Sequence, residues 1–158
     1  MGYIQFLREK VGNDYILLNA VAVIIENDQG QILLQKRSDN HLWGLPGGLI
    51  EVNESIESAA IREVKEETNL DIEVESFIGV FNNPFMRWRT NDYARIISFC
   101  FKAKVIGSEM KINDDESLEL KFFHYTDLPM IHSIDTLEMI QAYHQKLPMT
   151  VEGKRYHG

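Results

Sequence analysis

Three glutamates near the middle of the chain have the types and the spacing to bind a metal ion. Glu63, Glu66 and Glu67 lie three and four residues apart, which places them on one face of a helix. Carboxylates about 5 Å apart at an effective dielectric of about 20 repel by roughly 3 kcal/mol per pair, so a cation should offset the repulsion. Acidic oxygen donors without His or Cys suit a hard divalent ion, Mg²⁺ or Mn²⁺, better than zinc.

The same helix carries an apolar stripe, and part of the acidic group falls inside it. The stripe consists of Ile56, Ala59, Ala60 and Val64 at about 100° per residue. Glu63 and Glu67 lie within it, whereas an ordinary solvated charge run would lie on the opposite side. We therefore expect these two carboxylates to be partly buried.

The stretch from Gly48 to Leu70 resembles the Nudix box, G-x5-E-x7-R-E-U-x-E-E-x-G-U, in which U is a bulky aliphatic residue. The specified positions are held by Gly48, Glu54, Arg62, Glu63, Val64, Glu66, Glu67 and Leu70, and Pro46-Gly47 precede them. Asn69 replaces the last glycine of the pattern. Asn tolerates the left-handed conformation of a helix C-cap, so we expect the turn to be kept.

The resemblance implies an α/β fold, the Nudix-type α/β/α sandwich with a mixed β-sheet. It also implies Mg²⁺-dependent hydrolysis of a nucleoside diphosphate linked to another group, by water attack on phosphorus, with Mn²⁺ as the alternative ion. ADP-ribose or another nucleotide sugar, an oxidised or ordinary nucleoside triphosphate, and a dinucleoside polyphosphate all remain open as substrates. Dimers are frequent in the family, so a homodimer is part of the expectation.

Roles for individual residues follow from the same resemblance. Glu63, Glu66 and Glu67 supply metal ligands, and the Gly47 carbonyl is a further ligand. Glu54 and Arg62 form an ion pair that orients the loop and the helix beside Gly48. Either Glu63 or Glu66 activates the water, or a later acid does; the candidates for that acid and for further metal ligation are Glu116 and Glu119, which otherwise belong to a solvated acidic loop.

Aromatic and basic residues around a loop near residue 85 are the candidates for contacts with the substrate. Rings that would stack on a base are offered by Phe81, Phe85, Trp88 and Tyr93. Contacts with phosphate or a carboxylate would come from Arg37, Arg87, Arg89 or Arg95. The alternative for the rings is packing within the loop or core, and exposed arginines usually bind no ligand.

Composition supports one domain and excludes broad classes of partner. The chain has 158 residues, 44% of them hydrophobic and 25% charged, and a net charge of −8, which argues against a general nucleic-acid or membrane surface. Cys100 is the only cysteine, so no internal disulfide forms and a cytoplasmic location is expected. We predict one Nudix domain over residues 1–148, with residues 1–16 as a lead, and a polar, disordered tail over residues 149–158.

Hydrophobic patterning predicts the elements that position these residues. We expect a short helix within 3–14 and helices over about 54–68, with Asn53 as N-cap, and 134–145. Strands are expected over 17–26 and 31–36, joined by a turn at 27–30, and over 71–81, 93–105 and 118–125.

Two alternatives to an enzyme remain. One is a catalytically silent nucleotide-binding module on the same fold, which would be expected to lose carboxylates of the box, whereas this chain retains all of them. The other is a coincidental acidic helix in an unrelated structural protein, which would bind neither Mg²⁺ nor Mn²⁺.

Overall fold

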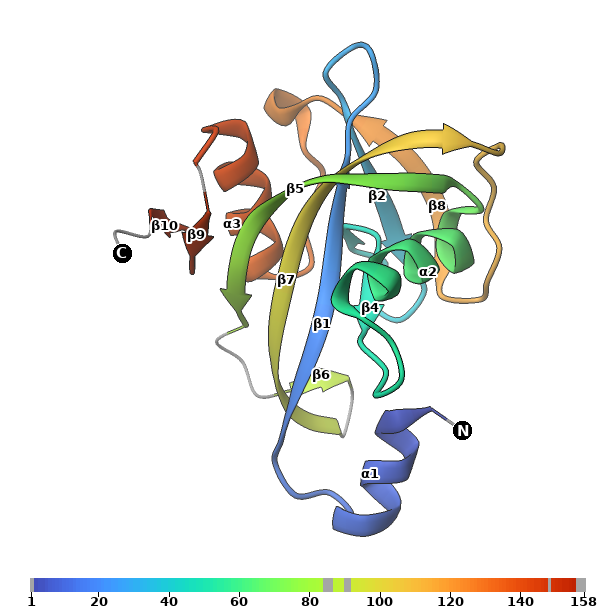
Figure 1. Cartoon of the computed structure of the whole chain (residues 1–158), viewed down its shortest axis with the longest axis vertical. Coiled ribbons are helices and arrows are strands. Elements are labelled where there is room, and N and C mark those ends of the chain that lie inside the picture. The colour runs from blue at the N-terminus through green and yellow to red at the C-terminus, as the bar shows by residue number, and fades with distance from the viewer. Residues whose placement is uncertain (1, 84–86, 90–91, 148, 156–158) are drawn as a thin grey trace.

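The computed structural model describes residues 2–83, 87–89, 92–147 and 149–155, without the side chains of 87–89, 92 and 155. The helices are α1 (Tyr3–Val11), α2 (Ile56–Thr68) and α3 (Ile134–His144), with a 3-10 turn η1 (Tyr125–Asp127). The strands are β1 (Ile16–Ile25), β2 (Ile32–Arg37), β3 (Trp43–Gly44), β4 (Gly47–Leu49), β5 (Asp71–Asn82), β6 (Arg87–Arg89), β7 (Asp92–Gly107), β8 (Ser117–Phe123), β9 (Thr150–Val151) and β10 (Lys154–Arg155). Figure 1 shows their arrangement.

The strands form a large mixed sheet and a smaller antiparallel one. The large sheet has the order β10-β9-β5-β7-β1-β4, with β6 paired to β7, and the small sheet has the order β3-β2-β8. Within the large sheet β1 runs parallel to β7, whereas β5 is antiparallel to β7 and β4 is antiparallel to β1. The central position of β1 explains why it reads as a nearly continuous apolar run.

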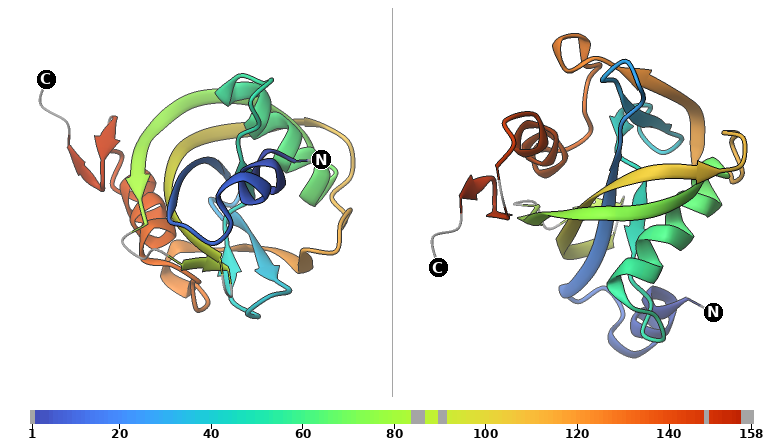
Figure 2. Two further views of the ribbon diagram at one scale, coloured as in Figure 1. Left: turned by 90° about the horizontal axis from the view of Figure 1, so that it is seen from below. Right: turned by 45° about the horizontal axis from the view of Figure 1, so that its top comes forward.

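Alternate residues of β1 contact helices on opposite sides. Val21, Val23 and Ile25 belong to the buried cluster that includes the apolar residues of α2. Ala22 and Ile24 belong to the cluster that includes those of α3. The views in Figures 1 and 2 accordingly place α2 and α3 on opposite sides of the sheet. The predicted α/β/α sandwich with a mixed sheet is confirmed.

The predicted turn after β1 forms, but the strands that it joins do not make a hairpin. The Asn27 side-chain oxygen accepts hydrogen bonds from the backbone N–H groups of Gln29 and Gln31. One bridge, between Glu26 and Ile32, links the two strands. Beyond it they separate, because β7 and β4 flank β1 whereas β3 and β8 flank β2.

Helix α2 begins two residues later than predicted, and its N-cap is Ser55, not Asn53. The Ser55 hydroxyl oxygen accepts a hydrogen bond from the Ser58 backbone N–H at 3.1 Å, so Glu54 lies in the preceding loop. At the other end, Asn69 has φ of 66° in the left-handed conformation. The predicted C-cap is therefore confirmed.

The end of the chain extends the large sheet. Strand β9 pairs in parallel with β5, so that Thr150 lies opposite Gly79, and β10 pairs with β9. A side chain at Gly79 would collide with the Thr150 carbonyl oxygen. The predicted disorder is wrong for residues 150–155, because two backbone ladders hold this segment. The described helices include none with both the length and the apolar character that a bilayer crossing requires.

Candidate active site

Two glycines allow strand β4 to lie tightly between β1 and α2. A side chain at Gly47 would collide with the backbone carbonyl of Val21. A Cβ at Gly48 would lie 2.5 Å from atoms of the Glu63 carboxylate. The absence of both side chains therefore brings the β4 backbone against the glutamates of the helix, as expected for a site where backbone and ligand approach closely.

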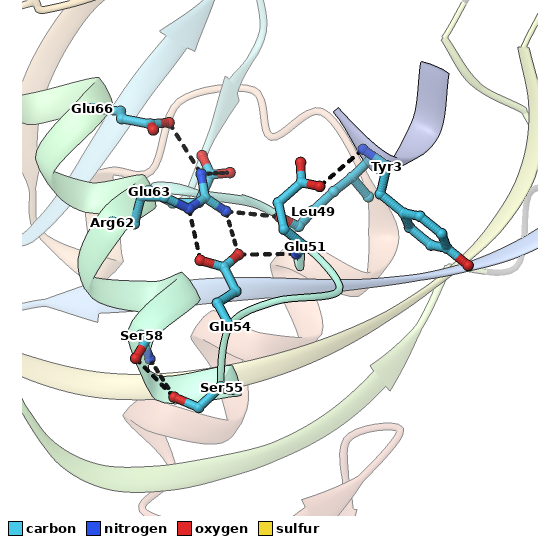
Figure 3. A network of polar contacts seen from close by, with 9 residues as sticks. All are labelled: Tyr3, Leu49, Glu51, Glu54, Ser55, Ser58, Arg62, Glu63 and Glu66. Atoms are coloured by element: carbon cyan, nitrogen blue, oxygen red, sulfur yellow. Dashed lines mark hydrogen bonds and ion pairs between the residues drawn. The ribbon is translucent and has the colours of Figure 1, made fainter. Parts of the chain in front are cut away.

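Arg62 is the centre of an ion-pair network that joins the loop to the helix (Figure 3). Its guanidinium donates to both oxygens of Glu54, at 2.8 and 2.6 Å, and to the Leu49 carbonyl oxygen at 3.1 Å. It also pairs with Glu63 at 3.0 Å and with Glu66 at 3.2 Å. The hydrogen bond from Arg62 lowers the pKa of Glu54 and outweighs the effect of burial.

Glu67 is the most buried carboxylate of the box, with only 2% of its surface exposed. One of its oxygens accepts a hydrogen bond from the Gly47 backbone N–H at 3.2 Å. Burial and then the neighbouring charge of Glu63 raise the pKa of Glu67 well above its usual value, while Gly47 and the Gln35 side chain lower it. Burial also raises the pKa of Glu63. The expected partial burial of Glu63 and Glu67 is found.

A second segment brings two more carboxylates to Glu67. Oxygens of Glu67, Asp114 and Glu116 lie within 4.8 Å of one another, although more than 45 residues separate Glu67 from the other two in the sequence. Carboxylate oxygens at this spacing fit a hard divalent ion. Burial and the charges of Glu63 and Asp114 raise the pKa of Glu67, and a bound cation would favour its charged form. These residues would hold a Mg²⁺ or Mn²⁺ ion.

The predicted ligands divide between two neighbouring groups. Glu63 and Glu66 are held by Arg62, and Glu66 keeps 55% of its side-chain surface exposed. Glu116 joins Glu67 as predicted, whereas Glu119 lies outside the group that the described residues form and is paired in register with Lys36. The Gly47 N–H contacts Glu67, and ligation by the Gly47 carbonyl stays a prediction.

Two polar residues that border Glu67 were missed from the sequence. Asp114 looked like part of a solvated acidic loop. Gln35 is almost fully buried and accepts a hydrogen bond from the Ser117 hydroxyl at 2.9 Å while facing Glu67. A glutamine inside an otherwise apolar strand, at 32–37, was the available signal.

A cation also lies near this group. Burial lowers the pKa of Arg37, but its hydrogen bond with Asp39 and the charges of Asp39, Glu116 and Glu67 raise it above its usual value. The Arg37–Asp39 distance is 2.7 Å. A fixed guanidinium beside an acidic group suits the binding of a phosphate that reaches the same place.

The predicted aromatic and basic contacts to substrate are only partly described. Phe85 lies outside the described residues. The backbone of Arg87 and Trp88 belongs to β6, but their side chains are also outside the described part. The ring of Tyr93 packs against Tyr15 with centroids 5.4 Å apart. Substrate contacts by these four residues stay predictions.

The α/β/α sandwich thus brings together the glycines of β4, the carboxylates of α2 and two acids from a later loop, Asp114 and Glu116. Residues 17–143 match the NUDIX domain family. The chain is 42% identical to an ADP-ribose pyrophosphatase of Methanocaldococcus jannaschii over 129 residues, which are 78% of this chain and 72% of that protein.

Two further relatives point to the same family. A protein of Bacillus subtilis described as a putative 8-oxo-dGTP diphosphatase is 35% identical over 108 residues, 68% of this chain and 67% of the relative. The crystal structure of an ADP-ribose pyrophosphatase from Streptococcus suis superposes with a TM-score of 0.66 at 25% identity, over 85% of this chain and 96% of that one. The chain belongs to the Nudix hydrolase family.

Proposed function

We propose that the chain is a Mg²⁺-dependent pyrophosphohydrolase that cleaves a nucleoside diphosphate linked to another group, with ADP-ribose as the first candidate substrate. One observation carries the proposal: the buried carboxylate of Glu67 meets Asp114 and Glu116 directly beside the Glu63–Arg62 pair. The ADP-ribose pyrophosphatase that is 42% identical supports this choice of substrate. The Bacillus subtilis relative makes an oxidised nucleoside triphosphate the second candidate.

Each part of the site has a chemical task in this reaction. A divalent ion held by Glu67, Asp114 and Glu116 would neutralise phosphate charge and lower the pKa of the attacking water. Arg37 binds a phosphate oxygen. Arg62 holds Glu63 and Glu66 toward the β4 backbone, and either of these carboxylates accepts the proton of the water. The bond that breaks joins phosphorus to the bridging oxygen of the diphosphate.

The test is a panel of ADP-ribose, another nucleotide sugar, 8-oxo-dGTP and dGTP, each incubated with Mg²⁺ or Mn²⁺. We expect turnover of at least one compound and its loss in Glu67→Gln. Hydrolysis in H₂¹⁸O should place the label in a phosphate product, because water attacks phosphorus. Label found only in a sugar hydroxyl, which attack at carbon would produce, would contradict the mechanism.

The silent binding module is the alternative function. It predicts that nucleotides bind, as measured by calorimetry, without turnover of any compound in the panel.

A cytoplasmic location and a homodimer also belong to the proposal. The single cysteine, Cys100, is buried and unpaired, which supports a reducing compartment. Light scattering of the purified protein would test the dimer.

A further inference from the structure

A pocket of about 340 Å³ lies among α1, the beginning of β1 and the loop that leads from β4 to α2. Its walls come from Tyr3 and Ile4 of α1, from residues 17–19 of β1 and from residues 49–52 of the loop, with Phe99 of β7 alongside. The volume falls within the range of about 300–1,000 Å³ for small-molecule sites. Most of the side chains that line it are apolar.

The pocket and the carboxylate site border the same two strands, β1 and β4. Val21 pairs with Gly48, the glycine against which the Glu63 carboxylate rests. Asn19 lies two residues earlier on the same face of β1, and Leu17 two residues before that. At about 3.3 Å per residue, these two lie roughly 7 and 13 Å from Val21. A diphosphate bound at the carboxylates therefore directs the group attached to it toward this pocket.

Helix α1 is fastened to the pocket loop by Glu51. The N-cap of α1 is Gly2, which has no side chain to cap the helix. Instead, the Glu51 carboxylate accepts a hydrogen bond from the Tyr3 backbone N–H at 2.9 Å, as Figure 3 shows. The Glu51 backbone N–H donates in turn to Glu54 at 2.9 Å. Polar contacts thus connect α1 with the ion pair that Glu54 makes with Arg62.

The far end of α1 is also held, and the helix precedes the residues that match the domain family. Arg8 donates hydrogen bonds to the carbonyl oxygens of Asp14, at 2.7 Å, and Tyr93, at 2.8 Å. Ile4 and Leu7 pack against the buried apolar residues at the beginning of β1. The match to the NUDIX domain begins only at residue 17. A wall fixed at both ends and lying outside the common domain can give this chain its own substrate preference.

We propose that α1 is a specificity element: Tyr3 and Ile4 wall a pocket that takes the nucleobase of the substrate, and Glu51 is the positioning residue that holds this wall. The inference rests on the proposed function, because it assumes a diphosphate at the carboxylates. An apolar pocket suits a planar heterocycle better than a sugar, whose hydroxyls would need many polar partners. The Asn19 amide, which has no hydrogen-bond partner among the described residues, faces the pocket and can read the edge of a base.

Two different substitutions remove the same hydrogen bond. Glu51→Ala removes the acceptor, and Tyr3→Pro removes the N–H donor. Proline is well tolerated at the first residue of a helix, and Gly2 has the extended conformation that precedes proline, with φ −72° and ψ 159°. Tyr3→Ala is the matched variant, because it loses the ring but keeps the N–H. Glu57→Ala, an exposed acid in the first turn of α2, controls for loss of charge.

The readout is inhibition by two products that differ in whether they carry a base. We expect the Ki of AMP to rise at least about 10-fold in Glu51→Ala. The Ki of AMP should also rise more in Tyr3→Pro than in Tyr3→Ala. In all of these variants the Ki of inorganic phosphate should stay within about twofold of the parent's value. Combining Glu51→Ala with Tyr3→Pro should add nothing to the larger single effect. Leu17→Ala, which changes an exposed pocket residue without altering α1, should also weaken the binding of AMP.

Unchanged AMP inhibition in both Glu51→Ala and Tyr3→Pro would overturn the inference, and so would equal losses for AMP and phosphate. Calorimetric titration of the parent protein with AMP separates this inference from the proposed function. If no diphosphate is hydrolysed but AMP binds and Glu51→Ala weakens it, the enzyme proposal fails and the pocket stands. If hydrolysis occurs but the variants keep the parent's AMP affinity, the pocket assignment fails alone.

Discussion

Replacing Arg62 with alanine should lower both the stability of the fold and the activity. The change leaves Glu54, whose side chain is 12% exposed, without its partner and releases Glu63 and Glu66. Removing one member of a buried ion pair costs about 3–5 kcal/mol. Because the Arg62 side chain is 31% exposed, water replaces part of the interaction, and we expect a loss of about 2–3 kcal/mol.

The measurement is thermal unfolding of the parent and the variants without added metal. At about 2–4 °C per kcal/mol for a chain of this size, Arg62→Ala should unfold about 4–12 °C below the parent. Lys65→Ala is the matched control on the same helix, since Lys65 is 43% exposed in its pair with Asp71 and an exposed pair contributes little to stability. Arg62→Lys should fall between the two, because lysine keeps the charge but not the two-pronged geometry.

The pH dependence gives an independent check of the same pair. Arg62 holds the pKa of Glu54 below its usual value of 4.5. A lowered folded-state pKa contributes stability above the unfolded pKa, and this contribution is lost as the pH falls through the folded pKa. The difference between parent and Arg62→Ala should therefore be largest near neutral pH and shrink below about pH 4. Equal melting temperatures for Arg62→Ala and Lys65→Ala at pH 7 would refute the role of Arg62 as an orienting residue.

The other predictions concern the carboxylates and the glycines. Without metal, Glu67→Gln should unfold at a higher temperature than the parent, because it removes a buried charge. It should also lose the stabilisation that Mg²⁺ confers. If Mg²⁺ raised the melting temperature of the variant as much as that of the parent, Glu67 would not belong to the site. Asp114→Asn and Glu116→Gln should weaken Mn²⁺ binding, measured by calorimetry, whereas Glu119→Gln should not. Gly47→Ala should lower the melting temperature more than Gly48→Ala, since the first meets the Val21 backbone and the second meets the movable end of Glu63; the opposite order would contradict this account of β4.

Local patterns predicted the central part of the site because its residues are close in the sequence. The box spans 23 residues, and helical spacing alone places Glu63 and Glu67 on the buried face. The Arg62–Glu54 pair also lies within that segment. The capping error was small but instructive, since Asn53 and Ser55 are both good caps and the choice depended on Glu54 turning toward Arg62.

These local patterns could not predict contacts between residues that are far apart in the sequence. Asp114 has no helical or strand periodicity to distinguish it, and it joins Glu67 only because β8 pairs with β2 and carries the preceding loop across the sheet edge. The pairing of β9 with β5 joins residues about 70 positions apart in the sequence, so a short polar tail gave no hint of it. The turn at 27–30 was local and correct, while the partners of its two strands were not local.

Because the whole chain is acidic, the binding of a diphosphate depends on the cations near the site. A net charge of −8 repels a diphosphate, and Glu63, Glu66, Glu67, Asp114 and Glu116 concentrate negative charge where the reaction would occur. Arg62 is already engaged by carboxylates. Arg37, itself paired with Asp39, is a further basic side chain on which the charges of Glu67 and Glu116 act. One guanidinium cannot balance five carboxylates and a diphosphate. Without a metal, these acidic residues would repel the substrate. When a divalent ion binds, they become its ligands, so metal and substrate binding should be strongly coupled in this protein.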